Sequence, residues 1–145
     1  MEMQDLFVLL TEEKHTIDIF TNGSRPLPDW VMRDHVTLIV DFKLPGSGEY
    51  GAFDGDNVKV LSKSRIRQSK HAIKFVCKDE NDFLTAMADI DAYRFNEFMQ
   101  VYFGVVWDVE FTNRDLSALI LEHAPFAKLN IQVHNIIWPA LERQR

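Results

Sequence analysis

The sequence has very little cysteine and no long apolar run. Cys77 is the single cysteine of 145 residues, so neither an internal disulfide nor a zinc site with a partner thiol can form. A reducing compartment fits this composition best. The longest apolar stretch, Val101 to Trp107, falls far short of a membrane span, and the acidic N-terminus has no signal-peptide core. We therefore expect a cytoplasmic protein that does not enter a membrane.

One long segment also lacks carboxylates. No Asp or Glu occurs between Asn57 and Lys78, although the whole chain has a net charge of −6. Seven of the sixteen basic residues lie there, namely Lys59, Lys63, Arg65, Arg67, Lys70, Lys74 and Lys78. The next segment, 79–97, is strongly acidic. Clustered cations are typical of contacts with phosphate or with an acidic protein surface, although a solvated loop has the same composition.

The composition is that of an ordinary folded domain. An apolar content of 46%, with eleven Phe, is enough to form a core at this length, and we expect a single domain over 1–145. The first half predicts short strands over 6–10, 15–21, 36–42, 58–61 and 72–77, with 6–10 and 15–21 forming a hairpin. Two long loops, 22–34 and 44–57, separate them. This half is therefore expected to be mostly antiparallel.

The second half predicts helices as well as strands. Residues 79–103 have helical spacing, with acidic side chains in the first turn and a break near Asp91. Alternation over 105–111 predicts a strand in which Trp107 is deeply buried. Thr112 and Asp115 form a capping box for a helix that ends before Pro125, and a strand over 131–133 follows. A strand–helix–strand unit over 105–138 thus completes an α+β fold.

The glycine-rich segment from Gly46 to Gly51 matches the G-x-G-x-x-G pattern of nucleotide-binding loops. In a dinucleotide fold, a helix follows these glycines and its N-terminus holds the pyrophosphate. Here the following residues, Ala52 to Asn57, are further turn sequence. We therefore expect a glycine-rich connection with no catalytic role.

One carboxylate–histidine group is the candidate for catalysis. On the expected strands, Asp108 and Glu110 would share an open face with His134, where they could carry out acid–base chemistry as in a small hydrolase or nuclease. The alternative is that this is only the solvated face of a half-buried sheet. The histidines show no metal-ligand spacing with one another or with Cys77, so no metal or cofactor is expected.

The function favoured by this layout is stoichiometric binding to a macromolecular partner rather than catalysis. The basic segment 59–74 would contact the partner, a protein being favoured over nucleic acid, and binding of nucleic acid or another polyanion is the first alternative. The candidate contact residues are Lys59, Lys63, Arg65, Arg67, Lys70, Lys74 and, on the first long loop, Trp30. The hydrolase or nuclease that uses the carboxylate–histidine group is the second alternative.

Overall fold

The computed structural model describes residues 3–63, 70–107 and 109–137. Strands alternate with helices along the chain, and several short 3-10 turns join them. The strands are β1 (Ile17–Thr21), β2 (Val36–Phe42), β3 (Ala72–Cys77), β4 (Gln100–Val105) and β5 (Lys128–Leu129). The helices are α1 (Met3–Glu12), α2 (Val58–Leu61), α3 (Glu80–Tyr93), α4 (Asn113–His123) and α5 (Val133–Ile137). The 3-10 turns are η1 (Asp29–Met32), η2 (Pro45–Ser47), η3 (Gly55–Asn57) and η5 (Phe95–Glu97).

All five strands form one parallel sheet in the order β1-β2-β3-β4-β5. The prediction of a mostly antiparallel, α+β fold is therefore wrong, because the structure is α/β. The error came from the long connections. Residues 22–34 and 44–57 do not join antiparallel strands. Each belongs to a crossover that returns the chain to the same end of the sheet.

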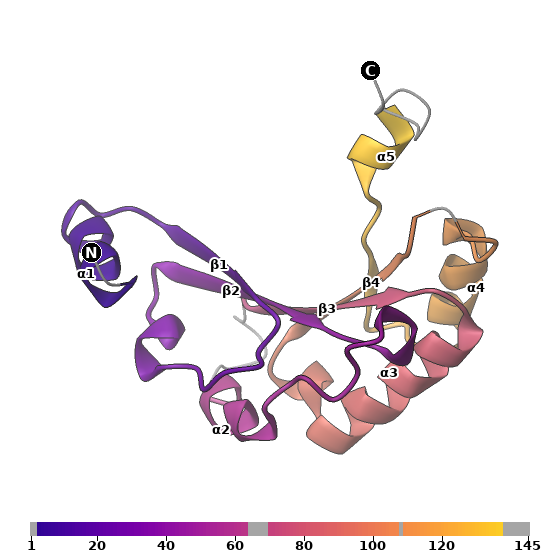
Figure 1. The fold of residues 1–145 in the computed structure, drawn as a ribbon, viewed down its shortest axis with the longest axis horizontal. Coiled ribbons are helices and arrows are strands. Elements are labelled where there is room, and N and C mark those ends of the chain that lie inside the picture. Colours follow the sequence, from indigo (N-terminus) through magenta and orange to yellow (C-terminus); the bar gives the residue numbers. More distant parts are fainter. Residues whose placement is uncertain (1–2, 64–69, 108, 138–145) are drawn as a thin grey trace.

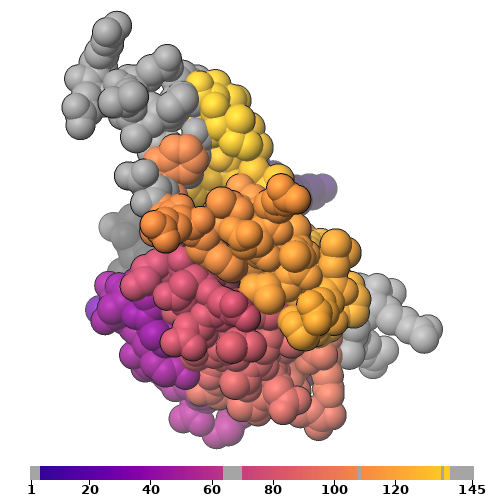
Figure 2. Space-filling view, turned by 90° about the vertical axis from the view of Figure 1, so that its right-hand side faces the viewer, coloured from indigo at the N-terminus to yellow at the C-terminus, as the bar shows by residue number. Residues whose placement is uncertain are grey.

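The helices α2, α3 and α4 lie on the same face of the sheet (Figure 1). Each strand pairs with the next one in the chain, and crossovers of one hand between such strands return on the same side. The face that carries these helices is called here the covered face, and the other the open face. Figure 2 looks at one end, where α3 and α4 form a continuous surface and α5 projects beyond it.

The covered face forms the core. Along β2 the side chains alternate between buried and half-buried positions, and the same alternation continues on β3 and β4. Phe75 and Phe103 are fully buried and stack with a centroid distance of 5.5 Å, and Phe83 of α3 contacts Phe103 at 5.0 Å. The buried strand residues that face the helices are Val36, Leu38, Val40, Phe42, Ile73, Phe75, Cys77, Val101 and Phe103. The strand predictions for 36–42 and 72–77 are confirmed.

Two expected strands are helices. Leu6–Leu10 belongs to α1, which buries Phe7 while Leu6, Val8 and Leu9 stay about half exposed. Residues 58–61 form α2. A short apolar run lacks the periodicity that would distinguish a buried strand from a helix. The secondary structure of both segments therefore depends on tertiary packing. The strand within 15–21 is present as β1, but it pairs in parallel with β2.

The expected helix over 79–103 is a helix followed by a strand. Asp79 caps α3, accepting a hydrogen bond from the backbone N–H of Asp82, as the acidic first turn indicated. The helix ends at Tyr93 because Arg94 adopts a left-handed conformation with φ of 58°. Residues 100–105 then form β4. The apolar positions of β4 also fitted a helical stripe, which hid the strand.

The last part of the chain was placed several residues too late. The helix α4 has the predicted capping box between Thr112 and Asp115 and ends before Pro125, so both predictions are confirmed. However, β4 ends at Val105, and Trp107 is 42% exposed on the turn that follows, so its predicted deep burial is wrong. The final strand is β5, and the region expected as a strand over 131–133 leads into α5 instead.

No helix within residues 3–63, 70–107 and 109–137 is long and apolar enough to span a bilayer.

Candidate functional site on the open face of the sheet

The open face carries polar side chains where the covered face carries Phe, Leu and Val. In the strand register, Asp41 pairs with Lys74, and Lys74 pairs with Tyr102. Side chains of paired residues lie on the same face, so these three form a row across the middle of the sheet. All three are half-buried. The α2, α3 and α4 helices lie on the opposite side of the sheet from this row (Figure 1).

Two adjoining hollows lie over this row. The first, called here the lysine hollow, has a volume of about 390 Å³ and is lined by Phe20, Thr37, Ile39, Lys70, Ala72, Lys74, Tyr102 and Asn130. The second, called the mixed-charge hollow, has about 490 Å³ and is lined by Phe20, Thr21, Asn22, Ile39, Asp41, Lys43, Glu49 and Lys74. They share Phe20, Ile39 and Lys74, so they form one trough. Ligand sites have volumes in this range.

Asp41 and Lys43 form an ion pair at the carboxyl end of β2. The Nζ of Lys43 donates a hydrogen bond of 2.8 Å to Oδ2 of Asp41. This bond raises the pKa of Lys43 above its ordinary value, against the opposite effect of partial burial. Lys43 therefore stays charged and holds the Asp41 carboxylate in place. Ligand-binding groups of parallel sheets gather at this end of the strands.

Beyond Tyr102, the row continues with a second polar group. Oε1 of Gln100 accepts a hydrogen bond of 2.7 Å from Nζ of Lys128 and one of 3.1 Å from the Tyr102 hydroxyl. The Lys128 ammonium also lies 5.4 Å from the centre of the Tyr102 ring. These contacts fix the position of the Tyr102 ring, which forms one wall of the lysine hollow.

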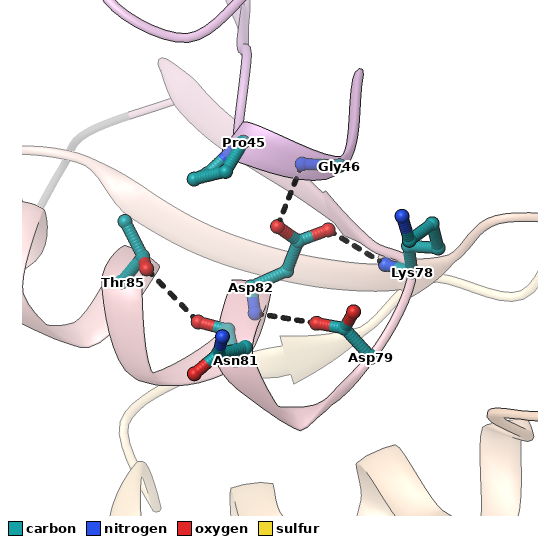
Figure 3. A pocket seen from close by; sticks show the side chains of 7 residues that line it. All are labelled: Pro45, Gly46, Lys78, Asp79, Asn81, Asp82 and Thr85. Carbon is teal, nitrogen blue, oxygen red and sulfur yellow. Dashed lines mark hydrogen bonds between the residues drawn. The ribbon is translucent and has the colours of Figure 1, made fainter. Parts of the chain in front are cut away.

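The loop after β2 is attached to the end of β3 by one carboxylate. Asp82 is 2% exposed, and its two oxygens accept hydrogen bonds of 2.9 Å from the backbone N–H groups of Gly46 and Lys78 (Figure 3). A small polar pocket of about 190 Å³ surrounds these contacts. Since both Asp82 oxygens are bound to the protein backbone, this carboxylate joins two loops.

These contacts also explain the glycine-rich segment. A Cβ at Gly46 would lie 2.3 Å from Oδ2 of Asp82, and Gly48 and Gly51 have φ values of 75° and 87° that favour glycine. The segment is followed by further turns and the short helix α2, with no long helix to hold a pyrophosphate. Steric and backbone requirements therefore explain why glycine occurs at these positions. That the segment has no catalytic role stays a prediction.

Asn57 joins the two long loops, a role that the sequence did not indicate. Its side-chain amide donates to the carbonyls of Gly23 and Arg25, at 2.8 and 3.0 Å, and its Oδ1 accepts from Leu27 N–H at 2.7 Å. Asn57 is 2% exposed. The loops 22–34 and 44–57 are therefore fixed to each other, which positions the Asn22 end of the trough.

The predicted basic segment is divided between several parts of the structure. Lys59 pairs with Asp56 at 2.9 Å and Lys63 pairs with Asp29 at 2.6 Å, both on the exposed surface. Lys70 and Lys74 line the lysine hollow instead. Arg65 and Arg67 lie outside the described residues. Trp30, expected as a contact residue, packs its ring 4.2 Å from that of Phe7, measured between centroids.

The predicted carboxylate–histidine group does not share a sheet face. Glu110 is exposed in the connection before α4, and His134 is exposed on α5, so neither lies on a strand. Asp108 lies outside the described residues. Sequence reasoning missed the residues that do share the open face, above all Asp41, Lys43 and Tyr102. The alternation of Asp41 with the buried Val40 and Phe42 was the available signal for Asp41.

Neither a metal cluster nor a reactive thiol is found in the described part of the chain. No group of three or more His, Cys, Asp and Glu residues there is arranged to hold a metal ion. Burial raises the pKa of the Cys77 thiol to about 12, with Asp82 and Asp79 adding to the effect. Cys77 is therefore a packed core residue with little thiolate at neutral pH.

The chain is similar to 7-carboxy-7-deazaguanine synthase of Koribacter versatilis (strain Ellin345), with 30% identity over 141 residues. The match takes in 89% of this chain, and the chain spans 59% of that relative's length. No family model and no solved structure matches. Similarity to a synthase contradicts the prediction of a non-catalytic binding protein, and it supports neither the nucleic-acid-binding nor the hydrolase alternative. The expected macromolecular partner stays untested.

Proposed function

We propose that the chain forms the sheet portion of an enzyme that forms a deazaguanine-type heterocycle, with this ligand bound on the open face. The observation that carries this proposal is the similarity to 7-carboxy-7-deazaguanine synthase along 89% of the chain. The polar trough supports it, because an enzyme needs an accessible site with a few oriented polar groups.

The chemistry of the trough suits the ligand that the relative's name implies. Such a molecule is a flat two-ring heterocycle with guanine-type N–H donors and, in the carboxylated form, an anionic substituent. The trough provides two carboxylate residues, three lysines and two aromatic side chains within hollows of about 390 and 490 Å³. A two-ring heterocycle fits sites of this size.

The residues of the trough would have distinct roles in binding such a ligand. Asp41, held by Lys43, offers acceptors for N–H groups of the heterocycle. Lys74 offers an ammonium to anionic groups, and Tyr102 offers a flat wall with a fixed orientation. Together these groups would orient the heterocycle over the middle of the open face.

The test is product formation in cells. The full-length protein would be produced in a bacterial strain that lacks its own 7-carboxy-7-deazaguanine synthase, and 7-carboxy-7-deazaguanine would be measured by mass spectrometry. We expect the product to reappear with the parent protein and to be lost with Asp41→Ala, which removes a trough carboxylate. Absence of product, together with no binding of 7-carboxy-7-deazaguanine to the purified protein, would overturn the proposal.

A further inference from the structure

We infer that Lys74 recognises the carboxylate of the ligand and that Asp41 recognises the guanine-type N–H edge. This inference rests on the proposed function and specifies the ligand class of the same site, namely a fused heterocycle with a carboxylate substituent. The two residues are register partners on β2 and β3, so they present opposite charges side by side on the open face.

The two hollows differ in charge, and this difference orients the ligand. The lysine hollow is lined by the side chains of two lysines, Lys70 and Lys74, and by no Asp or Glu. The mixed-charge hollow contains Asp41 and Glu49 as well as Lys43 and Lys74. An anionic group is therefore favoured in the first hollow and hydrogen-bond donors in the second, with Lys74 at the boundary between them.

Lys74 is available for an anion because Asp41 already has a cation. The ion pair between Asp41 and Lys43 occupies Oδ2 of the carboxylate at 2.8 Å, and no ion pair of Lys74 is found within the described residues. A lysine of this kind can form a charge-assisted hydrogen bond with a carboxylate in the ligand. A second oxygen of Asp41 remains to accept from the heterocycle.

The floor and walls of the trough suit a flat ring. Ile39 and Ala72 are register partners beside Lys74, and together they form an apolar floor. The short side chain of Ala72 leaves space above it. Tyr102 stands on one side, held by Gln100, and Phe20, which is 77% exposed, stands on the other. An aromatic side chain exposed to this degree gains apolar contact when a ring covers it.

The test compares two ligands that differ only in the carboxylate. Binding of 7-carboxy-7-deazaguanine and 7-deazaguanine to the full-length protein would be measured by isothermal titration calorimetry for the parent, Lys74→Met, Asp41→Asn and Lys59→Met. Lys59→Met is the control, since it removes an exposed lysine away from the sheet. Equal melting temperatures of the variants would establish that each is folded.

The expected result separates the two recognition groups. Lys74→Met should weaken binding of the carboxylated ligand by about tenfold to a hundredfold, the loss typical of a charge-assisted hydrogen bond, and should leave 7-deazaguanine binding unchanged. Asp41→Asn should weaken binding of both ligands by similar factors, and Lys59→Met should change neither.

The failures of the two proposals are distinguishable. If Lys74→Met weakens both ligands equally, or neither, the assignment of Lys74 to the carboxylate is wrong while the proposed function stands. If Asp41→Asn leaves both affinities unchanged, the assignment of Asp41 is wrong. If the parent binds neither ligand, the proposed function itself fails.

Discussion

The two faces of the sheet differ in what their side chains contact, although they come from the same strands. On β3, Phe75 is fully buried under the helices, whereas its neighbour Lys74 is half-buried and faces the trough. The covered face stabilises the fold through apolar contacts, and the open face is free to carry charges. The side chains that form the core and the polar side chains of the trough are thus separated by a single residue step along each strand.

Truncation on the covered face is the strongest test of this division. Phe75→Ala should lower the free energy of unfolding by about 3–5 kcal/mol, because it leaves a cavity between Phe42, Phe95 and Phe103. Urea denaturation followed by circular dichroism would measure the change. A loss below about 1 kcal/mol would contradict the placement of Phe75 in the core.

Substitution at the contact between Gly46 and Asp82 should lower the free energy of unfolding by less. Gly46→Ala places a Cβ 2.3 Å from Oδ2 of Asp82, so the carboxylate must release its backbone donors, at a cost of about 1–3 kcal/mol. In a protein that already carries Asp82→Ala, the same glycine substitution should cost much less. Additive losses in this double-mutant cycle would show that the two residues are not coupled.

A buried histidine makes the covered side sensitive to acid. His71 is 5% exposed, and its Nδ1 accepts a hydrogen bond of 3.1 Å from Leu38 N–H. Burial, with the nearby Lys70 charge, lowers the pKa of His71 below its ordinary value of 6.5. Between this lowered pKa and 6.5 the unfolded chain binds more protons, so stability falls as the pH drops through 6.5.

Melting curves at pH 7.5, 6.5 and 5.5 would measure this dependence. We expect the parent to lose more stability on acidification than His71→Gln, whose amide can still accept a hydrogen bond and does not titrate. Identical pH dependence of the two proteins would exclude His71 as the titrating group.

Substitution on the open face should have the smallest effect on stability. Lys74→Met should change the free energy of unfolding by no more than about 0.5 kcal/mol, because no ion pair of Lys74 is found within the described residues and the stem is retained. The same denaturation assay would measure it beside Phe75→Ala. A loss as large as that of Phe75→Ala would remove the distinction between the two faces.

The sequence predicted some elements from local patterns, but not every clear pattern was reliable. Strict alternation over 36–42 gave a strand that the structure contains, whereas the same alternation over 105–111 gave a strand that ends instead at Val105. The pair of Thr112 and Asp115 gave the start of α4 because its capping contacts are local. Local chemistry of this kind does not depend on the rest of the fold.

The remaining elements depended on partners distant in the chain. Leu6–Leu10 is helical because Phe7 packs on Trp30, a contact that no local pattern indicates. The parallel sense of the sheet follows from the crossovers, so it could not be obtained from strand patterns alone. The trough needs the register of three strands, and for that reason Asp41, Lys74 and Tyr102 were not associated before the sheet was known.

The strand order has a consequence for how the chain folds. Every strand pairs with the strand next to it in the chain, so no pairing has to close a loop around a third strand. The entropy cost of each closure is therefore that of one crossover only, which is lower than the cost of pairing strands from opposite ends of the chain.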